Sequence, residues 1–206
     1  MPSEPSTKRA AVFVDGQNLF HAAKKAFGYT YPNYDIMALA KAICAKSGWN
    51  LTQARFYTGI PDASDPRHTF WAAKLAAMGK QGIHVCSRPL RYLNKIVKLS
   101  DGSEQAILVG EEKGIDVRIA LDVIRMAHHG EYDVAIILSQ DQDLAEAAKE
   151  IRTIAHEQSR WIKIASAYPA SPTYKNKRGI NNTDWIPLDR TLYGACLDPT
   201  DYRTTP

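Results

Sequence analysis

Acidic residues stand beside apolar segments at three separated places in this 206-residue sequence. DGQN follows the apolar run AVFV, and KGID opens an apolar helical pattern. SQDQD begins with the serine that ends the apolar run VAIILS. Carboxylate, amide and hydroxyl groups at such places are suited to binding a metal ion or a phosphate. The side chains concerned are Asp15, Asn18, Asp116, Ser139, Asp141 and Asp143.

These three segments are predicted to meet in space. In an open parallel sheet, ligands bind at the carboxyl ends of the strands, and the helices that follow begin at the same edge. Converging carboxylates repel one another, and their hard oxygen atoms suit Mg²⁺ or Mn²⁺. We therefore predict a site for one of these ions, formed by Asp15, Asp116 and Asp141. Asn18 and Ser139 are predicted to orient Asp15, a substrate phosphate or a metal-bound water.

The same residues also have purely structural interpretations. An aspartate after a strand is often a helix N-cap, which explains any one of the three carboxylates but explains all of them together less well. Asp143 is a catalytic residue or a first-turn acid favoured by the helix dipole. Lys113 and Arg118 flank Asp116 as phosphate contacts or as solvated charges. Asp122 lies nearly two turns into its helix, which favours a supporting or a surface role.

Strand and helix patterns alternate along the chain and predict an α/β sandwich with a mainly parallel central sheet. In the helix predicted at 114–130, spacing places Val117, Ala120, Leu121, Ile124 and Ala127 on the apolar side. A hairpin is predicted over 95–110, with its turn at Asp101-Gly102. The other predicted strands are 11–15, 51–60, 83–90, 132–139 and 162–168, and the other helices are 18–27, 35–48, 65–82 and 141–152.

Three regions follow from the changes in composition along the chain. We predict a flexible tail at 1–9, one domain at 10–166, and a C-terminal extension at 167–206 that packs on the domain. Prolines break up the extension, and its large apolar residues give it side chains with which to dock. A basic cluster in the same extension leaves an RNA-binding arm as an alternative. That cluster comprises Lys175, Lys177 and Arg178.

Composition sets broad limits on location and partners. Apolar residues make up 45% of the chain, and the net charge is +4, which permits a polyanionic partner without requiring one. No run is long and apolar enough for a membrane span, and the N-terminus has no signal-peptide core. The three cysteines show no CxxC pairing, which is typical of reduced thiols. We therefore expect a cytoplasmic protein with no membrane partner, and a homo-oligomer is compatible with the sequence.

Three blocks of the sequence resemble those of the NYN-domain family, within the PIN-like ribonuclease superfamily. The blocks are VFVDGQNL, EEKGIDVRIALDVIRMA and YDVAIILSQDQDL, and the resemblance covers about residues 10–166. It implies a Rossmann-like, three-layer α/β fold, an acidic metal pocket and cleavage of RNA. Gln140, Gln142 and Leu144 depart from the usual pattern of the third block. Catalytic roles carry over from the family onto Asp15, Asn18, Asp116, Asp141 and Asp143.

The leading hypothesis is a Mg²⁺- or Mn²⁺-dependent ribonuclease. The alternative is a non-catalytic RNA- or nucleotide-binding regulatory module with the same pocket. A phosphotransfer enzyme is disfavoured, because Gln17 stands where such enzymes need a partner to an aspartyl nucleophile. Arg91 and Lys95, together with neighbouring basic residues and Tyr92, suit a phosphate backbone and a stacked base. A solvated hairpin face or an oligomer edge explains these two residues equally well.

Overall fold

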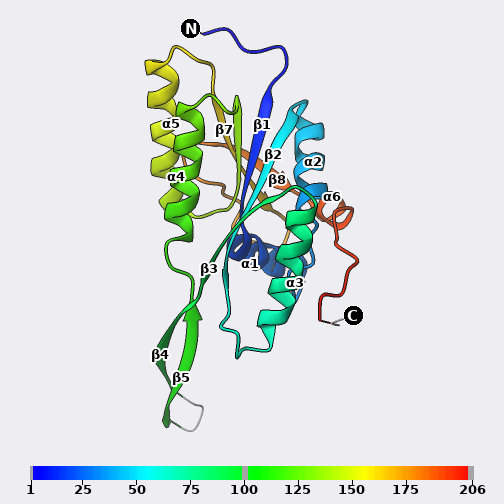
Figure 1. Ribbon diagram of the computed structural model, residues 1–206, viewed down its shortest axis with the longest axis vertical. Helices are drawn as coiled ribbons and strands as arrows, with labels where there is room; N and C mark the ends of the chain where they lie inside the picture. Colours follow the sequence, from blue (N-terminus) through cyan, green and yellow to red (C-terminus); the bar gives the residue numbers. More distant parts are fainter. Residues whose placement is uncertain (1, 99–101, 204–206) are drawn as a thin grey trace.

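The computed structural model describes residues 2–98 and 102–203. A six-stranded sheet has the order β3-β2-β1-β6-β7-β8, and a separate two-stranded hairpin projects from one end of it (Figure 1). The strands are β1 (Arg9–Asp15), β2 (Asn50–Ile60), β3 (His84–Pro89), β4 (Arg91–Lys98), β5 (Glu104–Glu111), β6 (Val134–Leu138), β7 (Lys163–Pro169) and β8 (Asp184–Leu188). The helices are α1 (Gly16–Phe27), α2 (Ile36–Ser47), α3 (Arg67–Lys80), α4 (Ile115–His128), the 3₁₀ turn η1 (Gln142–Leu144), α5 (Ala145–Glu157) and α6 (Arg190–Gly194).

Every strand pairing recorded within the six-stranded sheet is parallel, which confirms the predicted fold class. The central strand β1 pairs with β2 on one side and with β6 on the other. The order of strands along the chain therefore reverses at β1. Ligand sites in open α/β sheets form beside such a reversal, at the carboxyl ends of the strands.

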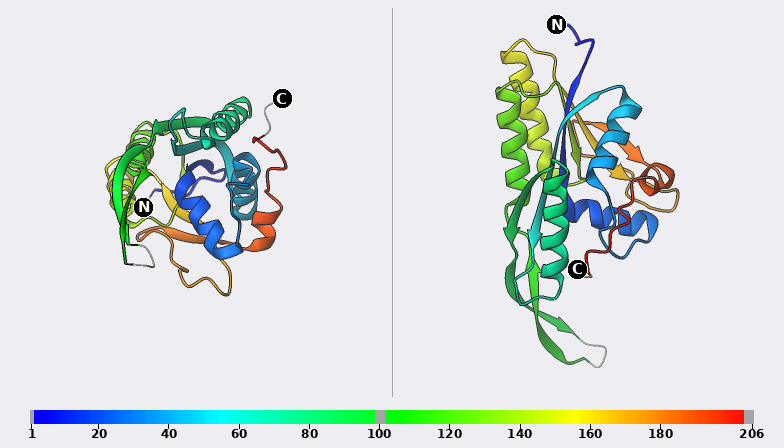
Figure 2. Two further views of the ribbon diagram at one scale, coloured as in Figure 1. Left: turned by 90° about the horizontal axis from the view of Figure 1, so that it is seen from below. Right: turned by 45° about the vertical axis from the view of Figure 1, so that its right-hand side comes forward.

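Two helical layers cover the two faces of the sheet (Figures 1 and 2). Val12 and Val14 of β1 belong to the core shared with α1 and α2, whereas Phe13 belongs to the core shared with α4 and α5. A strand buried on both faces needs apolar residues at successive positions, which explains the continuous run AVFV. Because the central strands are buried between the two helical layers, their ends are held in place, and so are the residues that directly follow them.

Helix α4 buries only part of the face that spacing indicated: Ala127 is fully buried, and Ala120 and Ile124 pack against the core. Val117 and Leu121 are 55% and 56% exposed, while Ile119 and the acidic Asp122 are fully buried. Asp122 accepts a hydrogen bond from Arg55 Nη2 on β2 at 2.9 Å. The prediction was wrong at Val117 and Leu121, because the helix turns the polar Asp122 inward to a partner on a distant strand. A buried ion pair thus takes the place of the surface role considered for Asp122.

The hairpin of β4 and β5 is antiparallel, as predicted, and begins four residues earlier than expected. Asp101 of the predicted turn lies outside the described residues. The hairpin extends beyond the end of the sheet at which β1 finishes (Figures 1 and 2). It therefore projects from the edge of the sheet where ligands are expected.

The C-terminal extension adds a strand to the edge of the sheet. Strand β8 pairs with β7 as an edge strand, and α6 follows it directly. Leu188 and Tyr193 are buried, which agrees with the docking expected from their apolar character. No helix in 2–98 or 102–203 combines the length and apolarity needed to cross a bilayer. All three cysteines are free.

Candidate acidic active site

Asp15 lies at the carboxyl end of β1 and caps helix α1. It is only 6% exposed. Its Oδ1 accepts a hydrogen bond from the backbone N–H of Asn18 at 3.0 Å, and its Oδ2 accepts one from Ser139 Oγ at 3.3 Å. The N-cap interpretation is therefore correct for this residue, and it coexists with a position inside a cleft.

The loop after β6 is bonded to the start of α1. The backbone N–H of Gln140 donates to Asn18 Oδ1 at 3.0 Å, and that of Asp141 donates to Ser139 Oγ at 3.1 Å. Asn18 and Ser139 thus hold Asp15 and Asp141 in a fixed relation at the reversal of strand order. The Asn18 side chain itself contacts Gln140, its backbone N–H contacts Asp15, and the roles predicted for Asn18 and Ser139 at a site stay predictions.

Four carboxylates line one cleft of about 480 Å³ at this edge of the sheet. Three of them, Asp15, Asp116 and Asp141, are those predicted to converge, and the fourth is Glu112. Lys113 is also part of the lining, as predicted for a phosphate contact. The sequence therefore predicted the meeting of three distant segments. Whether these side chains bind a metal ion stays a prediction.

Glu112 is the acidic residue that the sequence analysis missed. Its Oε1 accepts hydrogen bonds from the backbone N–H of Gly59 and from Thr58 Oγ1, the second at 3.3 Å. A Cβ atom at Gly59 would lie 2.6 Å from Glu112 Cγ, so only glycine allows this approach. The available signal was the second acid of EEKG, which lies directly before the loop that opens α4.

The electrostatics of the cleft are those of crowded carboxylates. The pKa of Asp15 is raised to about 7, mainly by burial and further by the charges of Glu112 and Asp141, against the lowering effect of its hydrogen bonds. Burial also raises the pKa of Glu112, with a contribution from Asp116. Such raised pKa values are frequent at functional sites, where like charges are held together at a cost in stability.

The donor set fits a hydrated Mg²⁺ or Mn²⁺. Within the described ranges, no three acidic, histidine or cysteine side chains are close enough to hold a metal ion by themselves. Magnesium commonly keeps several waters and uses one or two carboxylates together with substrate phosphates. Four carboxylates around one open cleft offer that kind of coordination, because all of their donors are oxygen atoms.

Two other predicted residues lie outside the cleft lining. Asp143 is exposed, and its backbone N–H donates to Asp141 Oδ1 at 3.0 Å. Arg118 donates to Asp122 Oδ1 at 2.7 Å, so its guanidinium group is engaged in the buried ion-pair network. Neither side chain is brought to the carboxylates that line the cleft.

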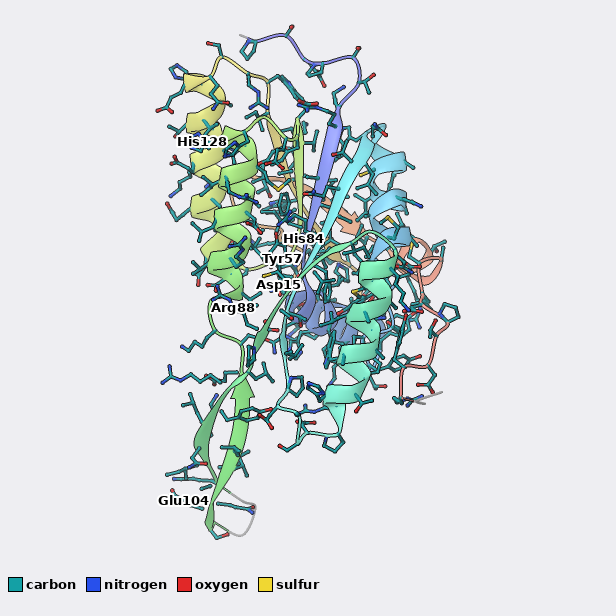
Figure 3. All side chains as sticks on the ribbon, in the orientation of Figure 1. Asp15, Tyr57, His84, Arg88, Glu104 and His128 are labelled. Carbon is teal, nitrogen blue, oxygen red and sulfur yellow. The ribbon has the colours of Figure 1, made fainter. Side chains whose placement is uncertain are left out.

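The basic residues of the hairpin lie beyond the cleft. Arg91 begins β4, and Lys95 Nζ is 2.5 Å from Glu111 Oε1 on the opposite strand. Arg88 is closer to the acidic residues: a Cβ atom on the cleft residue Gly114 would lie 2.6 Å from its Nη1. Figure 3 shows Arg88 beside the lower end of α4 and Glu104 far away on the hairpin.

The two glutamines that depart from the family pattern bind the C-terminal extension. Gln140 Nε2 donates to the carbonyl oxygen of Arg178 at 2.7 Å. Gln142 Nε2 donates to that of Gly179 at 3.1 Å, and Gln142 Oε1 accepts from the N–H of Asn181 at the same distance. The extension is therefore attached directly to the loop that carries Asp141.

Comparisons with known proteins agree with this architecture. The sequence matches the family model of the NYN domain over residues 9–178. A protein of unknown function from Vibrio parahaemolyticus RIMD 2210633, VPA0982, has a similar fold, with a TM-score of 0.54 and 21% identity over 91% of this chain and 97% of that one. A deacetylase–teicoplanin complex from teicoplanin biosynthesis has a TM-score of 0.31 and 15% identity over 76% and 68% of the two chains, too weak a likeness to support an argument. No curated protein matches the sequence.

Proposed function

This chain belongs to the NYN-domain family, part of the PIN-like nuclease superfamily, and on that premise we propose that it is a Mg²⁺- or Mn²⁺-dependent endoribonuclease. The observation that carries the proposal is the cleft lined by Asp15, Glu112, Asp116 and Asp141 beside the reversal of strand order. A cytoplasmic location and an RNA substrate belong to the same proposal.

In this proposal the metal ion would be held among Asp15, Asp116 and Asp141, by one or two of these carboxylates directly and by the rest through bound water, and Glu112 adds to the negative charge around it. When bound, the ion supplies a Lewis acid for the scissile phosphate and for the attacking water. Asn18 and Ser139 keep the Asp15 carboxylate oriented through the hydrogen bonds described above.

Cationic residues at the cleft provide contacts for the negatively charged strand. Lys113 lies in the lining, and the Arg88 guanidinium group lies against Gly114 at the rim. Both offset the repulsion between RNA and the carboxylates. Asp143 and Arg118, which do not line the cleft, are left with indirect roles in this proposal.

A non-catalytic RNA- or nucleotide-binding module is the second candidate function. Two observations favour it. Both carboxylate oxygens of Asp15 already accept hydrogen bonds from the protein. No three acidic, histidine or cysteine side chains of the described residues form a ready-made metal site. Such a module would bind RNA with the same cleft and leave the strand intact.

A cleavage assay separates the two functions. Metal-stripped protein is incubated with end-labelled RNA and DNA of the same sequence, and Mg²⁺ or Mn²⁺ is then restored. We expect internal cleavage of RNA only with metal, and its loss in Asp15→Asn, Asp116→Asn and Asp141→Asn. Asp184→Asn is the matched control, because Asp184 is exposed on β8 and pairs with Lys163. RNA that is bound and stays intact under every metal condition would favour the binding module.

A further inference from the structure

A second, larger cavity adjoins the acidic cleft. It has a volume of about 790 Å³ and shares Gln17, His21 and Glu112 with the cleft lining. Its walls come from α1, the loop after α1, the end of β2, α3 and the C-terminal segment 197–203. A ligand bound in the cleft could therefore extend directly into this cavity, because the two share part of their walls.

Aromatic rings contribute to several walls of the cavity. They come from four separate segments of the chain, and Phe70 packs edge-to-face against both Trp71 and Tyr202, with ring centres 5.6 and 6.0 Å apart. Tyr31 is 55% exposed at the cavity. Unpaired bases stack on such rings, and each stacked base contributes substantially to binding. The aromatic lining residues are Phe20, Tyr31, Phe70, Trp71 and Tyr202.

Asn33 supplies an unused polar group in the same wall. Its side chain is 4% exposed, and its Oδ1 has no hydrogen-bond partner in the described structure. A buried acceptor without a partner is costly and is rare in folded proteins. This oxygen atom is covered from solvent, so an N–H donor in the cavity would reach it and remove this cost only once the Asn33 side chain turns toward the cavity; the edge of a nucleobase carries such donors.

The C-terminal wall of the cavity is fixed by a buried cation. Lys74 is 1% exposed, and its Nζ donates to Asp198 Oδ2 at 2.8 Å and to the carbonyl oxygen of Tyr34 at 3.1 Å. The same Nζ lies 4.9 Å from the centre of the Tyr202 ring. The segment that closes the cavity is thus held against α3, so the cavity is formed before any ligand arrives.

We propose that this cavity binds an unpaired nucleobase of the RNA strand whose phosphodiester lies in the acidic cleft. This inference rests on the proposed function and names the site that selects the substrate. The rings stack the base, and Asn33 accepts a hydrogen bond from its edge. A base inside a duplex is stacked and paired with its neighbours, so a duplex cannot place one in the cavity without losing those interactions.

The test is binding measured in EDTA, so that cleavage plays no part. Fluorescence anisotropy reports the binding of labelled hexaribonucleotides, single-stranded or in a duplex, to the 206-residue chain. We expect single strands to bind more tightly, and Tyr31→Ala and Phe70→Ala each to weaken their binding about tenfold. Trp185→Ala is the matched control, since Trp185 is a 44% exposed aromatic residue on β8 that lines neither the cavity nor the cleft.

Two further measurements locate the base and test its recognition. A hexamer that contains 4-thiouridine is crosslinked by light, and mass spectrometry should place the crosslink on the aromatic residues of the cavity. Across hexamers that differ in one base, Asn33→Leu should remove the base preference of the unaltered protein. Melting curves verify that this variant folds, and the exposed Tyr31 provides a variant that does not depend on core packing.

The outcomes separate this inference from the proposed function. Crosslinks in the cavity without cleavage under any metal condition would leave this inference standing and overturn the nuclease proposal. Cleavage together with unchanged binding in Tyr31→Ala and Phe70→Ala would overturn the inference alone. Equal affinity for duplex and single strand, or crosslinks confined to the hairpin, would also contradict it. In those cases a different partner, such as a peptide, becomes the better occupant of the cavity.

Discussion

Asp15 combines burial, two hydrogen bonds and two acidic neighbours in one side chain. Burial and the charges of Glu112 and Asp141 raise its pKa from 3.8 to about 7. An acid whose pKa is higher in the folded state destabilises that state as the pH rises from the unfolded pKa to the folded pKa. For Asp15 this window extends from about pH 4 to pH 7, and the cost is fully present above it.

Asp15→Asn should therefore raise the melting temperature of the metal-free protein at pH 8. A shift of about three pKa units corresponds to about 4 kcal/mol, and asparagine caps a helix as well as aspartate does. The gain should shrink as the pH falls and disappear near pH 4. Melting curves from pH 4 to pH 8 measure it, with Asp184→Asn as the control. Equal melting temperatures at pH 8 would show that Asp15 is not under electrostatic strain.

Glu112→Gln tests the acid that the sequence analysis did not identify. The amide oxygen can still accept from Gly59, so we expect a folded protein. Metal-dependent cleavage should fall at least tenfold, because the cleft loses one of its four negative charges. Glu111→Gln is the matched control, since Glu111 pairs with Lys95 on the hairpin. Similar activities in the two variants would remove Glu112 from the site.

At the scale of elements, the two hairpin strands expose most of their residues. Its base is tied to the loop after β2 by a hydrogen bond from the Asp62 N–H to the Tyr92 hydroxyl at 2.9 Å. Lys95 is paired with Glu111, which leaves its charge partly compensated. Arg91, at the start of β4, lies nearest to the rim residue Arg88 in the sequence.

Replacing Arg91 should therefore weaken RNA binding more than replacing Lys95. We expect Arg91→Ala to reduce the slope of log affinity against log salt by about one, as for the loss of one phosphate contact. Lys95→Ala should change the slope less, because its partner already neutralises it. Anisotropy across a salt titration measures both. Slopes that match the unaltered protein in both variants would exclude the hairpin from RNA binding.

The C-terminal extension packs on the rest of the domain through buried apolar side chains. Deletion of residues 182–206 removes β8 and α6, including the buried Leu188 and Tyr193. Each large side chain contributes about 1.5–3 kcal/mol by its burial, and a domain of this kind has only about 5–15 kcal/mol in total. We expect an insoluble or unstable protein, as judged by expression and melting. A soluble, cooperatively folded truncation that has lost only RNA affinity would instead support the basic-arm interpretation.

The sequence predicted the elements better than it predicted their buried faces. Continuous apolar runs identified the central strands, because a strand covered on both faces has no polar alternation to obscure it. The predicted buried side of α4 was wrong at Val117 and Leu121, because Asp122 is buried and stabilised by Arg55 and Tyr57 from β2, and such partners cannot be read from spacing. Burial on its own would raise the pKa of Asp122, and these partners lower it overall.

At the scale of the whole molecule, the topology made the acidic cleft predictable. A parallel sheet brings the residues after β1 and β6 to one edge, so Asp15 and Asp141 could be placed together without coordinates. The aromatic cavity could not be predicted in this way. It is built from a helix, a loop and the C-terminal segment, whose relative positions depend on contacts such as that of Lys74 with Asp198.

The cleft and the cavity are lined by residues at the edge of the sheet where β1 finishes, and Figure 1 shows the hairpin projecting beyond that edge. In Figure 3, His128 marks the opposite end of α4, far from Asp15. An RNA strand that occupies the cleft would therefore contact one end of the protein and leave the other free. With a net charge of only +4, this local arrangement matters more for binding than the overall charge does.

The pairing of β1 with β6 also sets the order of events during synthesis. β1 leaves the ribosome long before its partner β6, which begins at Val134, and the Lys74 partner Asp198 is translated later still. Contacts so distant in the chain form slowly and late. A growing chain therefore carries all four carboxylates before it can hold them in a finished cleft, and the messenger RNA from which it is read is nearby throughout that interval.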